Sequence, residues 1–216
     1  KTGFPMGFQM SVMCIGQLAM QAGVNALGAD AIAGYTAATK IDQLSVLVDQ
    51  AFAIAISSYV AQNFGAGKFA RIRQGVRMSL IQTETANALM CIFILLFRSL
   101  FVPLFVDRPT QAIIAYSNGY LIAVSPFYLV LGLLSVYRSA IQSMGNGRVP
   151  FAACIIELIM RICGTMGLSL LWGYTGICLA SPLAWIGATS LLILVYYRMI
   201  GKLDPQNTAR SKRVRA

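Results

Sequence analysis

Long apolar runs are the feature of this sequence that most constrains its fold. A helix needs about 20 apolar residues to cross the hydrocarbon core of a bilayer. Within hydrocarbon the backbone must satisfy its own hydrogen bonds, which a helix does. Six runs are long enough, and we expect a bundle of six transmembrane helices in an all-α integral membrane protein. They cover roughly residues 4–27, 31–63, 76–106, 113–143, 149–172 and 176–199.

The composition agrees with a membrane protein. Charged residues make up only 11% of the chain and hydrophobic residues 57%, whereas a soluble domain carries about a quarter charged residues. A net charge of +10 could suit a nucleic-acid partner, but the basic residues stand in short clusters between apolar runs. We therefore expect membrane lipid, and no nucleic acid, as a partner.

Basic residues gather in alternate connections between the runs. The connections after the second, fourth and sixth runs are basic, and the others carry little net positive charge. Because basic loops stay on the cytoplasmic side, we expect a plasma-membrane protein with both termini of this segment in the cytoplasm. We assign residues 1–200 to the transmembrane lobe and 201–216 to a basic cytoplasmic tail. The basic loop residues are Lys68, Arg71, Arg73, Arg77, Arg138, Arg148, Arg198, Lys202, Arg210, Lys212, Arg213 and Arg215.

Polar and ionisable side chains at membrane depth are costly, so they are candidates for a substrate or ion pathway. One stripe recurs every four residues in the first run, and two aspartates seven residues apart share a helix face in the second. The stripe could instead form hydrogen bonds between helices. In the second run, Lys40 could simply compensate the charge of Asp42, with the other polar residues at a water-exposed helix end. The candidates are Gln17, Gln21, Asn25, Lys40, Asp42, Gln43 and Asp49.

Two further acids stand in later runs. Glu157 precedes Arg161 by four residues, a spacing that favours an ion pair along one helix, and we interpret this as a structural charge pair. Glu84 has no basic partner at helical spacing. Since it follows Arg77 by a few residues, we expect it near the cytoplasmic boundary.

Enzyme signatures are missing from the sequence. It contains no histidine, no phosphate-binding loop and no nucleophile elbow. The five cysteines lie in apolar stretches without a CxxC motif, which favours unpaired apolar side chains over a metal site. We therefore predict no catalytic residue, no metal site and no cofactor.

Three segments resemble the multidrug and toxic compound extrusion (MATE) family. They are the run Lys40-Ile-Asp-Gln-Leu, the Gly-rich segment that begins at Tyr59, and the segment Tyr137-Arg-Ser-Ala-Ile-Gln-Ser-Met-Gly-Asn-Gly. In the Gly-rich segment, glycine allows the backbone to turn sharply between two helices. Its motif consists of Gln62, Asn63, Gly65, Gly67 and Arg71.

The resemblance implies an architecture and an activity. Family members have twelve helices in two lobes, and this chain resembles the second lobe alone, so we expect the N-terminal six-helix lobe of the same protein as its partner. The family exports organic cations and other small amphipathic molecules by alternating access, in exchange for H⁺ or Na⁺. Coupling acids of some members fall near Met13, Lys40 and Leu131, none of which is acidic. We therefore expect the other lobe to bind most of the coupling ion.

The sequence thus predicts one lobe of a secondary active exporter. Two alternatives stay open. A lipid-linked oligosaccharide flippase of the same superfamily would use a more cationic cavity, and Lys40 favours it. A non-transporting scaffold built from a half-protein would need no coupling acid.

Overall fold

The computed structural model describes residues 3–203, and all of the regular structure within this range is helical. Of the predicted tail at 201–216, residues 204–216 lie outside the described part. The elements are α1 (Gly3–Asn25), α2 (Ala29–Gly65), α3 (Phe69–Phe105), α4 (Gln111–Val124), the 3₁₀ turn η1 (Ser125–Phe127), α5 (Tyr128–Ser143) and α6 (Arg148–Leu203).

Four helical stretches are long and apolar enough to cross a membrane. They are Ala29–Gly65, Phe69–Phe105, Gln111–Ser143 and Arg148–Leu203. The third combines α4, η1 and α5, with Pro126 in the 3₁₀ turn that joins the two α-helices, as expected for a residue that lacks an N–H. The all-α membrane class is confirmed, whereas the number of six crossings stays a prediction.

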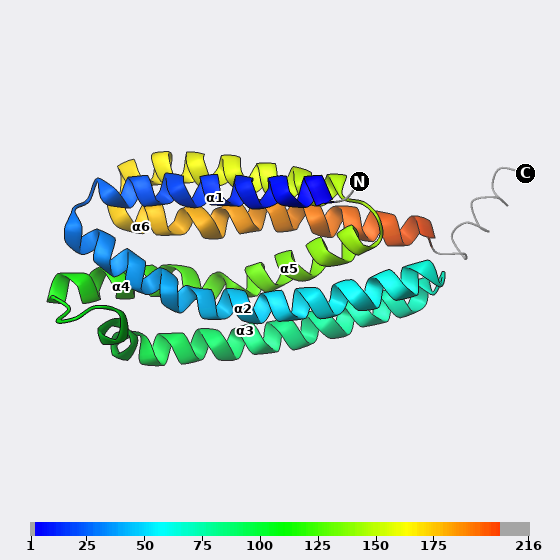
Figure 1. Ribbon diagram of the computed structural model, residues 1–216, viewed down its shortest axis with the longest axis horizontal. Coiled ribbons are helices and arrows are strands. Elements are labelled where there is room, and N and C mark those ends of the chain that lie inside the picture. Colours follow the sequence, from blue (N-terminus) through cyan, green and yellow to red (C-terminus); the bar gives the residue numbers. More distant parts are fainter. Residues whose placement is uncertain (1–2, 204–216) are drawn as a thin grey trace, which may run out of the picture.

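The 56-residue helix α6 folds back on itself at Gly173, where φ is 54° and ψ is −128°. A positive φ of this kind suits glycine because it has no Cβ. On either side of this point the two arms pack against each other through small residues: Gly164 lies against Ala180, and Gly176 against the backbone of Leu168. Figure 1 shows the arms side by side in yellow and orange. The predicted fifth and sixth runs are these two arms.

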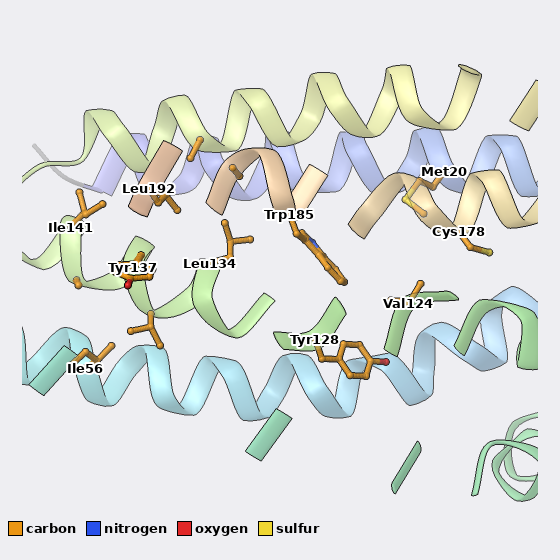
Figure 2. Close-up of a cluster of buried hydrophobic side chains, with 14 of the residues drawn as sticks. Met20, Ile56, Val124, Tyr128, Leu134, Tyr137, Ile141, Cys178, Trp185 and Leu192 are labelled. Atoms are coloured by element: carbon orange, nitrogen blue, oxygen red, sulfur yellow. The ribbon is translucent and has the colours of Figure 1, made fainter. Parts of the chain in front are cut away.

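The helices are arranged around α5 (Figure 1). One side is formed by α1 with the two arms of α6, and the other by the hairpin of α2 and α3, while α5 contacts α2, α3 and α6. Figure 2 shows the apolar core between these layers, with Met20 of α1, Ile56 of α2, Tyr137 of α5 and Trp185 of α6. Each of these side chains is buried.

The Gly-rich motif forms the tight connection between α2 and α3. Gly67 has a φ of 67°, and its N–H donates to the carbonyl of Phe64 at 3.1 Å, while the N–H of Lys68 donates to that of Asn63 at 2.8 Å. Glycine in this conformation commonly ends a helix in this way. Asn63 adds a bond from Nδ2 to the carbonyl of Tyr59 at 2.8 Å. The motif residues therefore stop α2 and reverse the chain.

The connection after α5 closes in the same way. Gly145 has a φ of 83°, and its N–H donates to the carbonyl of Gln142, while the N–H of Asn146 donates to that of Ile141. The two loops that the charge pattern places on one side of the membrane thus share one hydrogen-bond pattern, although their sequences resemble each other only weakly.

Candidate functional site

The most polar part of the interior lies where α2, α3 and α5 meet. Asp49 of α2 is 2% exposed and Asn87 of α3 is fully buried. Asn87 Nδ2 donates to Asp49 Oδ1 at 2.9 Å and to the main-chain carbonyl of Tyr128 at 3.0 Å. One amide therefore joins the three helices at the level of a buried carboxylate.

Glu84 lies in the same place, three residues before Asn87 on α3. A Cβ on Gly132 of α5 would be 2.9 Å from Glu84 Oε1 and 2.5 Å from Asn87 Nδ2, so the absent side chain of this glycine makes room for both. The carboxylate of Glu84 is close enough to Asp49 to interact with it electrostatically. We call Asp49, Thr83, Glu84 and Asn87 the carboxylate layer.

The expected position of Glu84 near the cytoplasmic boundary stays a prediction, but along the helix this residue lies well away from the loop. Glu84 is about 22 Å along α3 from its first residue, at 1.5 Å per residue, and Asp49 is about equally far from the other end of the same loop. Packing brings these two acids from different helices together near the middle of the hairpin. Sequence spacing within one helix contains no sign of this contact.

Asp42 lies two turns from Asp49 on α2, and the two carboxylates interact electrostatically. The hydroxyl of Tyr120 in α4 donates to Asp42 Oδ2 at 3.4 Å, and the hydroxyl of Tyr128 also lies beside this carboxylate. Figure 2 shows Tyr128 next to α2. The shared face of Asp42 and Asp49 thus points into the lobe.

Several oxygen atoms of this region have no hydrogen-bond partner among the described residues, 3–203. In the carboxylate layer they are Asp49 Oδ2, Thr83 Oγ1, Glu84 Oε1 and Asn87 Oδ1. Buried polar atoms are nearly always paired, and each exception needs an explanation such as an ion or a mechanistic role. Neither Asp49 nor Glu84 forms an ion pair within residues 3–203.

The other predicted candidates lie on the surface of the lobe. On α2, Lys40 and Gln43 are exposed. On α1, Gln21 Nε2 donates to Asn25 Oδ1 at 2.9 Å, and Gln17 is exposed. Since α1 packs mainly along α6, the structure does not bring this stripe together with the carboxylate layer.

The predicted charge pair of Glu157 and Arg161 is part of a buried triad. Arg161 Nη2 is 3.2 Å from Glu157 Oε1, and Arg138 Nη2 of α5 is 2.6 Å from Glu157 Oε2. The sequence analysis assigned Arg138 to a basic loop, whereas its guanidinium links α5 to α6. We interpret the triad as structural because both guanidinium groups pair with Glu157 and so tie α5 to α6.

A groove with a volume of about 430 Å³ lies between α2 and α3, on the loop side of the carboxylate layer. Ser79 in its wall is one helical turn before Thr83 on the same face of α3. The groove is lined by Phe52, Ala55, Ile56, Tyr59, Gln74, Gly75, Met78, Ser79 and Gln82.

The sequence analysis missed Thr83 and Asn87, although a signal for them exists. Ser79, Thr83 and Asn87 recur every four residues, the same spacing that identified the polar stripe of the first run. All three are buried. Tyr120, in contrast, has no comparable pattern around it.

Comparison with known proteins connects this architecture to characterised sequences. The family model MatE matches residues 5–167. The probable multidrug resistance protein YpnP of Bacillus subtilis is 26% identical over 92% of this chain, which covers 44% of that protein. The FAD transporter of Shewanella oneidensis is 25% identical over 77% of the chain and 36% of its own length. The chain thus spans less than half the length of these relatives.

Solved structures share the fold. A MATE protein in complex with MaL6 superposes with a TM-score of 0.84 over 94% of this chain and 46% of its own, at 16% identity. A MOP superfamily transporter from Pyrococcus furiosus gives a TM-score of 0.82 over 94% of this chain and 44% of its own, also at 16% identity. Since the family model covers well over half of the sequence, the chain belongs to the MatE family of multidrug and toxic compound extrusion transporters.

Proposed function

We propose that this chain is the second lobe of a secondary active exporter that moves organic cations, drugs or toxic metabolites across the plasma membrane by alternating access. The observation that carries the proposal is the MatE match over residues 5–167. The fold supports it, since about 94% of the chain superposes on less than half of a MATE protein. The other half would be the N-terminal six-helix lobe, and we propose no enzymatic activity.

Exposed polar side chains on spanning helices support a partner lobe. Gln17 and Asn25 on α1 and Lys40 and Gln43 on α2 are exposed on the surface of the lobe. Such groups are costly against lipid tails, and in transporters they face a water-filled cavity or another repeat. We infer that the N-terminal lobe and the substrate pathway cover this surface.

We infer that H⁺ or Na⁺ drives the export. The family positions near Met13, Lys40 and Leu131 carry no acid, which supports a main coupling acid in the other lobe.

The experiment is a transport assay on the full-length protein in proteoliposomes. We expect efflux of a cationic dye such as ethidium under an imposed H⁺ or Na⁺ gradient, and no efflux without one. The matched control is the same protein with the gradients collapsed by ionophores. Failure to move any cationic dye under either gradient would overturn the proposal and favour a non-transporting scaffold.

Exposed Lys40 supports a second candidate, export of an anionic substrate. A lysine in a substrate cavity attracts phosphate groups, as a lipid-linked oligosaccharide flippase would require, and one relative is named an FAD transporter. In this case FAD or a lipid pyrophosphate would compete with the dye. Lys40→Met would weaken the competition by an anion and leave dye efflux intact, whereas a cation exporter would show no such competition.

A further inference from the structure

We propose that this lobe has a cation site of its own, in which Asp49 and Glu84 together hold one small monovalent cation such as Na⁺ where α2, α3 and α5 meet. The binding itself does not depend on the proposed export activity. Its role as a second coupling site, in contrast, rests on the proposed export activity.

The arrangement of oxygen atoms is the first argument. Asn87 uses both of its Nδ2 hydrogens, on Asp49 and on the carbonyl of Tyr128, so its Oδ1 is left as an acceptor without a donor. Asp49 Oδ2, Glu84 Oε1 and Thr83 Oγ1 are in the same state. Asp49, Thr83 and Asn87 are all at least nine-tenths buried. Four adjacent residues therefore present oxygen atoms that a positive ligand would satisfy.

The balance of charge is the second argument. Asp49 and Glu84 are near enough to repel each other, and Asp42 acts on Asp49 from the same helix. The titratable groups facing them from α4 and α5 are the phenols of Tyr120 and Tyr128, which carry no positive charge. Of the three acids Asp42, Asp49 and Glu84, Arg161 acts on Asp42 alone, and its ion-pair partner is Glu157. A cation between the two acids would remove the repulsion.

The type of ligand follows from the donor atoms. Carboxylate, amide and hydroxyl oxygens suit hard cations rather than the softer transition metals. Within residues 3–203 there is no group of three His, Cys, Asp or Glu side chains that could hold a metal ion, which argues against a divalent site rich in carboxylates. Two carboxylates and two neutral oxygens fit one monovalent cation.

The groove between α2 and α3 lies one helical turn from the site, on its loop side. Ser79 lines it, and Thr83 of the carboxylate layer follows one turn later on the same face of α3. A hydrated cation could enter from the loop side between the two helices and exchange water for the oxygens of Thr83 and Glu84. Gly132 leaves the opposite wall without a side chain at this level.

The test is equilibrium binding of ²²Na⁺ to the purified full-length protein in detergent, at constant ionic strength with choline as the replacement ion. We expect Asp49→Asn and Glu84→Gln each to reduce the number of bound Na⁺ ions by one per protein, or to weaken that site at least tenfold. Asp30→Asn, which changes an exposed acid of the same helix, is the matched control and should bind as the wild type does.

Three outcomes would overturn the site: no Na⁺ binding to the wild-type protein, unchanged stoichiometry and affinity in both variants, or an equal loss in Asp30→Asn.

Gel filtration of each variant excludes misfolding, and Gly132→Ala provides a further test because it crowds the same oxygens while keeping both charges. Carboxyl infrared bands that report a bound proton on Asp49 at saturating Na⁺ would also count against it. If Na⁺ binds but no dye is exported, the site is supported and the export activity is rejected. If dye is exported but Na⁺ does not bind, the export activity is supported and the site is rejected.

Discussion

The lobe has acidic groups in two interior regions, which differ in whether basic side chains neutralise the acid. In the triad, Glu157 lies between two guanidinium groups, each within ion-pair distance. In the carboxylate layer, Asp49 and Glu84 lie near each other, and within residues 3–203 they have no basic partner and their outer oxygens have no hydrogen-bond partner. Buried ions of either kind are expensive. Within the described residues, the acid of the triad is therefore compensated by basic groups of the lobe, and the acids of the layer are not.

This difference indicates what each region does. The triad joins α5 to α6 through an acid that two basic groups of the lobe already pair with. An uncompensated layer is stable only when something positive arrives, so its occupancy can change with the surroundings. Such a change between α2, α3 and α5 is what a carrier needs if binding is to alter helix packing.

The largest effect is expected from Glu157→Gln. The substitution leaves the buried Arg161 and the partly buried Arg138 without an acid, and breaking a buried ion pair in this way costs about 3–5 kcal/mol. The measurement is the free energy of unfolding of the full-length protein in micelles. Asp30→Asn, an exposed change on α2, should stay within about 0.5 kcal/mol of the wild type. A Glu157 variant as stable as this control would show that the triad is not structural.

Gly132→Ala should be the next most damaging change. The new Cβ would lie 2.5 Å from Asn87 Nδ2 and 2.9 Å from Glu84 Oε1, and overpacking of this kind costs about 1–3 kcal/mol. Gly119→Ala on α4 is the control, because its Cβ would meet its nearest neighbour, Tyr174, at 3.8 Å. Equal stability of the two variants would mean that the carboxylate layer can accommodate the added methyl group.

In a buffer without Na⁺, Asp49→Asn should stabilise the protein, whereas Glu157→Gln should destabilise it. The neutral amide keeps an oxygen for the bond from Asn87 and removes a charge that no base compensates, so the free energy of unfolding should rise by on the order of 1 kcal/mol. Saturating Na⁺ should stabilise the wild type and leave the variant unchanged. A loss of stability as large as that of Glu157→Gln would place Asp49 among the structural groups.

The sequence predicted what depends on residues close along the chain. The apolar runs identified the all-α membrane class, the glycine of the Gly-rich motif does adopt a positive φ at Gly67, and the spacing of Glu157 and Arg161 matches an ion pair in the structure. Each of these features depends on local geometry. A helix period or a turn conformation is sufficient to predict them.

Contacts between helices could not be predicted in this way. Glu84 meets Asp49 and Arg138 meets Glu157 only because α5 packs between α2, α3 and α6. The aspartates of α2 were identified, but whether their face points into the lobe or toward a cleft depends on Tyr120 and Tyr128 from later in the chain. Exposed Lys40 and buried Asp49 share one apolar run, so hydrophobicity alone cannot separate them.

The smallest effect is expected from Tyr120→Phe. It tests whether Asp42 is compensated, as Glu157 is in the triad, or uncompensated, as Asp49 is in the carboxylate layer. The hydroxyl of Tyr120 approaches Asp42 Oδ2 at 3.4 Å, which is long for an O–H···O bond. We therefore expect Tyr120→Phe to cost only about 0.5 kcal/mol. A double-mutant cycle with Asp42→Asn should give a coupling of similar size, measured from the free energies of unfolding. A coupling several times larger would make Asp42 a structural acid that is compensated as Glu157 is, whereas the small value leaves it with Asp49 and Glu84, available to a cation.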